Sequence, residues 1–261
     1  MHFDLADQYR PGPSFVHKLD PRVKVVVALA FILAVGLMPI GAWRGYAALL
    51  ILALGAALAS GLGLTFALRR SYVALPFALV ALPLLLTVPG EIVYQMPLTG
   101  WTITAQGLER FLSLMLRSWI AIQVAILLTA VTAFPDVLWV LGALRFPRVL
   151  VATIGFMYRY FFVLADEAAH MLRARAARSA ELAGRRRPSA LWQGRVAGHM
   201  VGSLFLRALE RSERVHAAML ARGYNGQMPS LARREMRRVD WLVILAGALL
   251  LVGLLAWARP F

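Results

Sequence analysis

Long apolar runs separated by short polar stretches dominate the first half of the chain and return at its end. Each run is close to the roughly 20 apolar residues that a helix needs to cross the hydrocarbon layer. The pattern predicts five membrane spans, over residues 25–40, 46–64, 72–88, 108–134 and 241–257. Pro76 and Pro83 fall inside the third run, and prolines are tolerated in membrane helices when neighbours satisfy the freed carbonyls. We therefore expect one continuous span there, followed by an external loop over residues 89–104.

A different pattern occupies residues 135–239, where apolar positions and arginines recur at helical spacing. It predicts amphipathic helices over residues 137–145, 148–183 and 196–222. If the N-terminus lies inside, four spans return the chain to the inside before these helices begin. A crossing by the second helix would then carry the following arginines outside, against the preference of Lys and Arg for the cytoplasmic side. We therefore expect all three helices to lie along or under the inner leaflet.

The expected fold is an all-α integral membrane protein with about five transmembrane helices and three amphipathic cytoplasmic or interfacial helices. Its expected parts are an N-terminal segment with four spans (residues 1–134), a cytoplasmic helical part (135–239) and a C-terminal span (240–261). The basic residues before the first span place the N-terminus on the cytoplasmic side of the membrane, which the chain crosses several times.

Composition supports this interpretation. The chain is 60% hydrophobic and 16% charged, with a mean hydropathy of +0.68, which is more apolar and less charged than a soluble domain of this length. The net charge of +15 raises the question of nucleic acid, but most basic residues lie in the 145–238 region or in short loops between apolar runs. That distribution favours a lipid bilayer and excludes nucleic acid as the expected partner.

The sequence lacks the usual signatures of catalysis. There is no cysteine, and the only two lysines, Lys18 and Lys24, do not follow a glycine-rich loop, so no phosphate-binding loop is present. No HExxH or G-x-S-x-G motif occurs, and the five histidines lack the spacing of a metal-binding helix. We therefore expect no enzyme activity, no catalytic residue, no metal site and no cofactor in this chain.

The helix over residues 196–222 carries an arginine stripe. Glu210 lies three residues after Arg207 and four before Arg214, so it is expected to pair with both. Arg222 falls in the last turn, with Gly223 expected as a left-handed cap. Such a stripe is commonly a solvated or headgroup-facing surface. The arginines of the stripe are Arg207, Arg211, Arg214 and Arg222.

Two triplets change that interpretation for two arginines: Ala177-Arg178-Ser179 and Ala221-Arg222-Gly223, each at a predicted helix end. Small neighbours allow a guanidinium and its helix end to enter a groove on a partner. The planar fork can there bind a carboxylate through two hydrogen bonds, which lysine does not reproduce. Ala174-Arg175-Ala176 is a third triplet of similar type, so we choose Arg178 and keep Arg175 as the alternative.

These triplets resemble the twin signature of the transmembrane (T) components of energy-coupling factor transporters, a class of ABC importers, and the surroundings are similar to the cobalt-type CbiQ family. The other matching stretches are S-F-V-H-K-L-D-P-R-V-K (14–24), F-M-Y-R-Y-F-F-V-L-A-D-E (156–167) and R-S-E-R-V-H-A-A-M-L-A-R-G-Y-N-G (211–226). The resemblance implies a non-catalytic subunit for cobalt or nickel import, linked to cobalamin biosynthesis. It also implies two coupling helices that end in the triplets, with Arg175, Arg207, Arg211 and Arg214 in supporting positions.

The partners that the resemblance implies are two ATP-binding cassette ATPases, which bind ATP and magnesium, and a membrane substrate-binding subunit similar to CbiM. A small auxiliary membrane subunit is left open. The alternative function is a membrane-embedded lipid or prenyl transferase with a basic phosphate-binding face, for which the 13 acidic residues show no suitable spacing. A permease with its own ion pathway is a third possibility, with Arg117 as the mid-depth ionisable residue. For Arg117, a structural hydrogen bond and a functional role are equally good interpretations.

Overall fold

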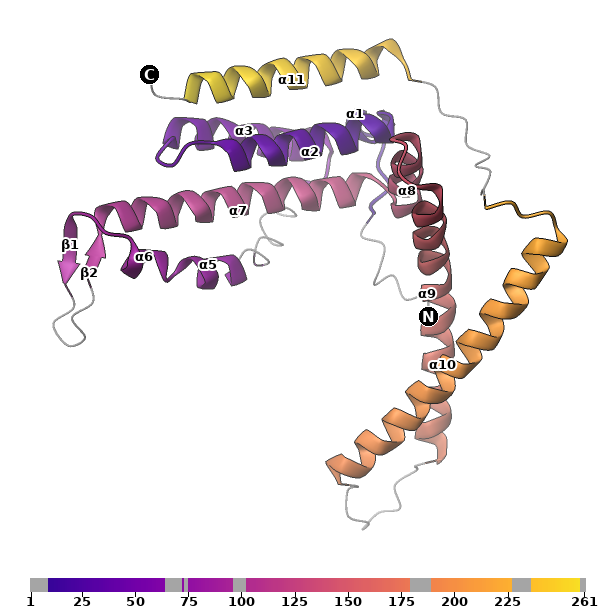
Figure 1. Ribbon diagram of the computed structural model, residues 1–261. Coiled ribbons are helices and arrows are strands. Elements are labelled where there is room, and N and C mark those ends of the chain that lie inside the picture. The colour runs from indigo at the N-terminus through magenta and orange to yellow at the C-terminus, as the bar shows by residue number, and fades with distance from the viewer. Residues whose placement is uncertain are drawn as a thin grey trace. The chain divides into compact units, whose positions relative to one another are not determined.

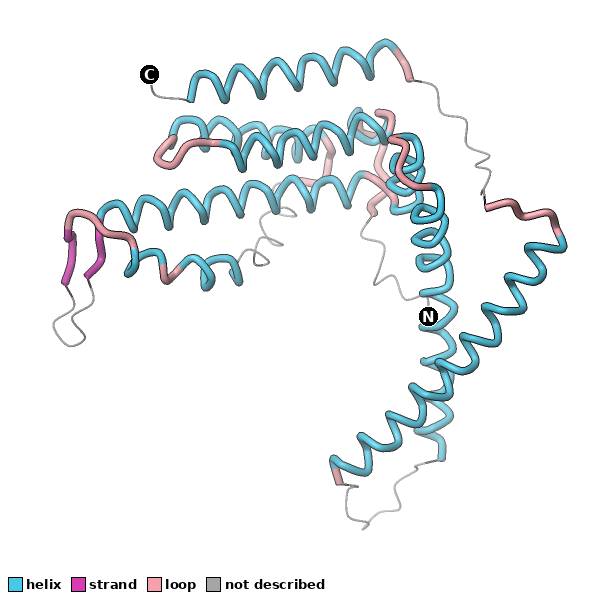
Figure 2. Tube along the Cα trace, viewed as in Figure 1, coloured by secondary structure: helices cyan, strands magenta, loops and turns pink. Residues whose placement is uncertain are grey.

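The computed structural model describes residues 9–63, 72, 75–95, 102–178, 189–226 and 236–258. Figures 1 and 2 show that the described chain is helical except for one short hairpin, which confirms the expected fold class. It divides into two compact units, one built from residues 4–140 and 232–261 and the other from residues 141–231. We call the first the membrane unit and the second the crossed-helix unit.

Four long helices form the core of the membrane unit: α2 (Pro21–Leu37), α3 (Trp43–Ala59), α7 (Ala105–Val131) and α11 (Arg238–Ala258). Helix α2 packs against α7 and α11, and α3 also packs against α7 and α11 (Figure 1). The buried contact is built from aliphatic, aromatic and small residues, because small side chains let membrane helices approach closely. Its members include Ala28, Phe31, Val35, Tyr46, Leu49, Ala53, Ile120, Val124 and Leu251.

Helix ends in this unit follow local chemistry. The carboxylate of Asp20 accepts the Arg22 N–H at 2.8 Å and Pro21 occupies the first turn, so α2 begins there. Gly41 has a φ of +79°, a conformation that glycine adopts without strain, in the short turn from α2 to α3. Thr104 caps α7 by accepting the Gly107 N–H at 3.0 Å. The short helix α1 (Phe15–Lys18) precedes α2, with Ser14 as its cap.

The third expected span is not one helix, so that prediction is wrong in its detail. The segment forms α5 (Leu75–Ala81) and α6 (Leu84–Thr87), of 7 and 4 residues, separated at Leu82 and Pro83. Pro83 has no N–H to continue the hydrogen-bond ladder, which explains the break. Neither piece approaches the roughly 30 Å of the hydrocarbon layer at about 1.5 Å per residue. Both pack against α7, so the segment follows α7 as a broken path.

The expected loop over residues 89–104 contains a hairpin instead. Strands β1 (Ile92–Gln95) and β2 (Thr102–Thr104) pair antiparallel, with Ile92 opposite Thr104 and a bulge between Ile92 and Tyr94 (Figure 2). The β-branched residues of I-V-Y-Q and T-I-T are the signal that would have predicted it.

Helix α8 (Phe134–Ala143) connects the two units along the chain, and the crossed-helix unit consists mainly of α9 (Arg148–Arg178) and α10 (Ala190–Ala221). By length and composition, α7, α9 and α11 are each able to cross a membrane. The expectation that α9 lies along the inner leaflet therefore depends on the charge balance of the loops, and it stays a prediction.

Candidate functional site

Helices α9 and α10 cross one another within their own unit, and Figure 1 shows the crossing. One groove between them is lined by Ala168, Met171 and Leu172 of α9 and by Met200 and Leu204 of α10, among others. A second groove joins earlier residues of α9 to later residues of α10: Phe156 and Tyr160 with Arg211, Val215 and Met219. Because residue numbers rise along one helix as they fall along the other, the pair runs antiparallel.

An ion pair lies between the two grooves. The guanidinium of Arg207 on α10 donates to the carboxylate of Glu167 on α9 at 2.6 Å, and the two side chains are 62% and 31% exposed. The expectation that Glu210 holds Arg207 is therefore wrong, while Glu210 does lie 3.8 Å from Arg214. Glu167 therefore contacts α10 at the point where the two helices cross.

The second triplet forms a complete helix cap. The N–H of Tyr224 donates to the Met219 carbonyl and the N–H of Gly223 to the Leu220 carbonyl, both at 3.0 Å, which is the Schellman arrangement. Gly223 has a φ of +80°, so the expected left-handed cap is confirmed. Arg222 is the last residue before that turn, and Ala221, Arg222 and Gly223 are all exposed. The small residue that follows Arg222 is therefore explained by the structure, because Gly223 forms this cap.

The first triplet lies at the end of α9. Ala177 and Arg178 occupy the last turn and are exposed, whereas Ser179 lies outside the described residues. Arg175 is half-buried and lines the groove against α10. The structure therefore separates the two candidate arginines: Arg175 faces the partner helix within the chain and Arg178 is presented to the outside.

The two triplets lie on opposite sides of the crossing. At about 1.5 Å per residue, Arg178 and Arg222 are on the order of 16 Å and 22 Å along their helices from the Glu167–Arg207 contact. Since the helices run antiparallel, these two arms point away from each other, which separates the guanidinium groups by more than about 25 Å. One groove on one partner could not hold both helix ends. The arrangement suits two separate binding surfaces.

The two remaining candidates, Arg211 and Arg214, both lie on the part of α10 that leads from Arg207 to Arg222. Arg211 lines the second groove and is half-buried, while Arg214 is exposed on α10. The sequence interpretation gave no role to Phe156, Tyr160 or Tyr224, which line the groove next to the Arg222 end. Their aromatic character in an arginine-rich region was the signal for a contact surface.

No group of three or more His, Cys, Asp or Glu side chains within metal-binding reach occurs in the described parts of the chain. The crossed-helix unit offers cationic helix ends and apolar grooves. Such an arrangement can bind and transmit force, since rigid helices carry a displacement applied at one end to the other.

Arg117, the ionisable residue that the sequence placed at mid-depth in the membrane, has structural partners. Its Nε donates to the Tyr46 hydroxyl at 2.8 Å, and its terminal nitrogen donates to the Met38 carbonyl at the end of α2. The Tyr46 hydroxyl in turn donates to the Pro39 carbonyl at 2.9 Å. The guanidinium therefore satisfies the Met38 carbonyl where α2 ends, and of the two interpretations the structural hydrogen bond is the one observed.

Comparison with known proteins places this geometry in context. A family model described as cobalt transport protein (CbiQ) matches residues 12–231. The energy-coupling factor transporter transmembrane protein EcfT of Listeria innocua is 29% identical over 98% of this chain and 98% of its own length. The EcfT of Brevibacillus brevis is 27% identical over 97% of each chain. The cobalt transport protein CbiQ of Rhodobacter capsulatus is 30% identical over 77% of this chain and 83% of its own.

Proposed function

The chain belongs to the CbiQ family, the energy-coupling transmembrane subunits of energy-coupling factor transporters, and from that premise we propose that Arg178 and Arg222 are its two contacts with the transporter's ATPases. Members of this family are non-catalytic, multi-pass membrane subunits, and ATP binding belongs to the ATPase partners. The alternative of a membrane-embedded transferase is therefore set aside.

One observation carries the proposal: two exposed arginines end two antiparallel helices, on opposite sides of a single crossing. A site for one partner would need both groups on the same side. Two ends that point apart suit two ATPase subunits, each with a groove that takes one helix end. The guanidinium of each would bind a carboxylate there through paired, charge-assisted hydrogen bonds.

The proposed mechanism is mechanical. When ATP brings the two ATPases together, the helix ends that they hold are displaced toward one another. Because α9 and α10 are joined by the Glu167–Arg207 pair and by two apolar grooves, the angle between the helices changes about that crossing. Such a hinge or shear of packed helices would move the separate substrate-binding membrane subunit. That subunit would then release its ion.

We propose cobalt as the transported ion, with nickel as the competing choice. The family description and the CbiQ relative support cobalt, while the EcfT relatives carry no metal in their names. Because the described residues hold no ligand cluster, selection of the ion would reside in the substrate-binding partner. If the substrate-binding subunit is exchanged for one from another source and this chain is kept, we expect the cobalt-to-nickel preference to change to that of the new subunit.

The membrane orientation belongs to the same proposal. The N-terminus and the crossed-helix unit lie on the cytoplasmic side of a bacterial membrane, and the C-terminus lies outside. A reporter protein fused after residue 261 should give the signal of an external location. A cytoplasmic signal would show that α9 or another helix crosses in a way that the loop charges did not predict.

The central test uses the chain co-expressed with candidate ATPases and a substrate-binding subunit. Arg178→Ala and Arg222→Ala should each lower ATPase co-purification and ATP-dependent cobalt uptake more than about tenfold, because loss of a buried charge pair at an interface costs several kcal/mol. Arg173→Ala on α9 and Arg195→Ala on α10 are matched controls, since both arginines are exposed and lie outside the triplets. Full assembly and uptake in both triplet variants would refute the proposal.

A further inference from the structure

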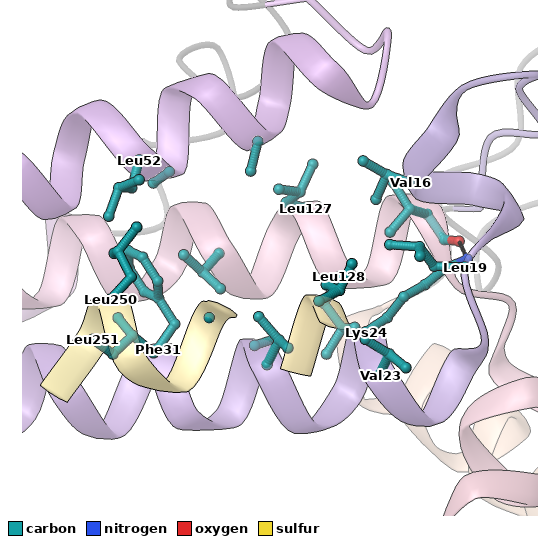
Figure 3. Close-up of a pocket in the computed structure, with 18 residues that line it drawn as sticks. Val16, Leu19, Val23, Lys24, Phe31, Leu52, Leu127, Leu128, Leu250 and Leu251 are labelled. Atoms are coloured by element: carbon teal, nitrogen blue, oxygen red, sulfur yellow. Dashed lines mark hydrogen bonds between the residues drawn. The ribbon is translucent and has the colours of Figure 1, made fainter. Parts of the chain in front are cut away.

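The two units contain hollows with different linings. The cavity of about 260 Å³ inside the membrane unit, among α2, α3, α7 and α11, is lined mostly by aliphatic side chains such as Leu128 and Leu250 (Figure 3). The second groove of the crossed-helix unit, with a volume of about 340 Å³, is lined by aromatic rings, a methionine and an arginine. It combines apolar surface with hydrogen-bond donors, which is the combination that a specific binding site needs.

The residues around the second groove are of the kinds that carry binding energy at protein interfaces. Tyrosine, phenylalanine, methionine and arginine are enriched in such interfaces, and tyrosine and arginine are frequent among their hot spots. The groove brings together Phe156 and Tyr160 of α9, Arg211 and Met219 of α10, and Tyr224. The rings of Phe156 and Tyr160 are stacked, with centroids 6.5 Å apart, and form one apolar wall. This composition favours a protein side chain as the occupant.

The groove also contains donors that the chain itself does not satisfy. The Arg211 side chain is half-buried, and no group in the described parts of the chain accepts a hydrogen bond from its guanidinium. The hydroxyls of Tyr160 and Tyr224 likewise make no hydrogen bond with the described residues. A guanidinium and two hydroxyls can all donate to a carboxylate.

The carboxylates of the two helices do not offset the charge of Arg211. The described parts of α9 and α10 carry four of them: Asp166, Glu167, Glu210 and Glu213. Glu167 is paired with Arg207, and Glu210 lies next to Arg214. Glu213 is exposed about 200° around α10 from Arg211, and Asp166 is exposed six residues beyond Tyr160. Arg159 adds another exposed positive charge on α9. A carboxylate for Arg211 must therefore come from a partner.

The wall of the groove is part of the cap that presents Arg222. Met219 and Tyr224 both line the groove, and the Tyr224 N–H donates to the Met219 carbonyl at 3.0 Å. Arg211 and Arg222 are eleven residues apart, which is close to three helical turns, so they lie on the same side of α10. A partner that holds Arg222 is therefore beside the groove. The first groove, next to the Arg178 end, has no aromatic side chain among its lining residues.

We propose that the second groove receives an apolar side chain of the ATPase that holds Arg222, and that Arg211 binds a carboxylate close to that side chain. This contact rests on the proposed function, in which an ATPase holds Arg222, and it adds a second point of attachment to the same subunit. Phe156, Tyr160 and Met219 bury the apolar group. The two attachment points are roughly 16 Å apart along α10, so the ATPase can turn the helix as well as displace its end.

The first test measures the affinity of purified ATPase for the full chain in nanodiscs. Every variant also carries Arg178→Ala, which leaves the Arg222 end as the binding surface. Ser212 is an exposed residue at the edge of the groove, so Ser212→Trp should obstruct it and weaken binding by about tenfold or more. Leu206→Trp adds the same side chain at a position that is 61% exposed and outside both grooves, and should leave the affinity unchanged.

A second pair of variants tests the charge. Arg211→Ala should weaken binding by about tenfold, because the ATPase carboxylate loses its hydrogen-bond donor. Arg195→Ala, at an exposed position of the same helix, should leave the affinity unchanged.

Arg222→Ala in the same background separates this contact from the proposed function. If Arg222→Ala weakens binding while Ser212→Trp and Arg211→Ala do not, the groove contact is refuted and the coupling role of Arg222 stands. If Arg222→Ala leaves the affinity unchanged, the proposed function itself fails.

A crosslinking measurement identifies the occupant without filling the groove. A photoreactive phenylalanine analogue replaces Ser212 in the full chain, which is co-expressed with the ATPases and the substrate-binding subunit. Crosslinks should map to the ATPase, at an apolar residue close in sequence to an Asp or Glu. The same analogue at Leu206 should give no crosslink to an ATPase. Crosslinks from position 212 that reach only the substrate-binding subunit or lipid would reject the proposal.

Charge reversal then tests the partner of Arg211. Arg211→Glu should weaken binding more than Arg211→Ala, because two carboxylates would then face each other. Changing the mapped ATPase carboxylate to arginine should restore the affinity of Arg211→Glu by about tenfold or more, which is the coupling expected of a close charge pair. No restoration would show that this carboxylate does not bind Arg211.

Discussion

Asp240, in the first turn of α11, accepts the backbone N–H of Asp20, which lies 220 positions earlier at the start of α2, across 3.2 Å. The other oxygen of Asp240 accepts the N–H of Arg237 at 2.8 Å, so one carboxylate satisfies donors at the starts of two helices. Asp240 is only 4% exposed. The first and last long helices of the membrane unit are therefore fixed to each other at one point.

Replacing this carboxylate should destabilise the membrane unit. Asp240→Ala leaves two donors without their acceptor, at a cost of about 1–3 kcal/mol for each that remains buried. For a chain of this size the apparent Tm in detergent should fall by about 5 °C or more. Glu213→Ala, at an exposed position of α10, is the control and should change the Tm by less than about 2 °C. A similar small shift in Asp240→Ala would mean that the contact is not formed in the membrane.

Tyr46 and Arg117 give a second stability prediction. Tyr46 is almost fully buried, and its hydroxyl accepts from Arg117 and donates to Pro39. Tyr46→Phe should cost about 1–3 kcal/mol, because the Arg117 Nε–H loses its acceptor within the bundle. Arg117→Lys should cost a similar amount, since one ammonium lacks the fork that reaches both Tyr46 and Met38.

The readout for both variants is thermal unfolding in detergent together with cobalt uptake. A structural role predicts a lower Tm and, below that Tm, uptake close to the wild type. If uptake is lost while the Tm is unchanged, Arg117 belongs to an ion pathway and the structural assignment is wrong.

The sequence predicted the long helices well because a helix that is surrounded by hydrocarbon needs a long apolar run. The helices over Pro21–Leu37, Ala105–Val131 and Arg238–Ala258 each begin or end within a few residues of the expected spans. The third span was different, because apolarity alone does not tell whether a proline such as Pro83 bends a helix or ends it. The hairpin at Ile92–Gln95 and Thr102–Thr104 was missed because its strands are only 4 and 3 residues long.

For the candidate site, local features were predicted and tertiary ones were not. The cap at Gly223 follows from a glycine after a helical run. The partner of Arg207 could not be found by counting three or four residues along one helix, because Glu167 lies 40 positions away on α9. The half-buried position of Arg175 likewise depends on the crossing with α10. Spacing along one helix does not specify where two helices meet.

The Glu167–Arg207 pair should contribute little to stability. The Arg207 side chain is 62% exposed, and exposed pairs contribute about 0–1 kcal/mol because water and salt screen them. A double-mutant cycle with Glu167→Gln and Arg207→Gln should give a coupling free energy below about 1 kcal/mol that decreases as salt is added. A coupling above about 2 kcal/mol, insensitive to salt, would show that the pair is covered by a partner or by lipid headgroups.

Gly223 offers a test of the Arg222 helix end that leaves the arginine in place. Gly223→Ala forces a Cβ into the left-handed region, at a cost of roughly 1–2 kcal/mol, so the last turn of α10 should fray. Amide exchange should accelerate at Tyr224, whose N–H bonds the Met219 carbonyl, and ATPase co-purification should weaken although Arg222 remains. Gly202→Ala on the same helix is the matched control: its Cβ meets no atom within 4 Å, and alanine in a helix interior stabilises by about 1 kcal/mol. The two identical substitutions should therefore act in opposite directions on the stability of α10. If both leave exchange and co-purification unchanged, the cap does not position Arg222, and a partner must fix that helix end by itself.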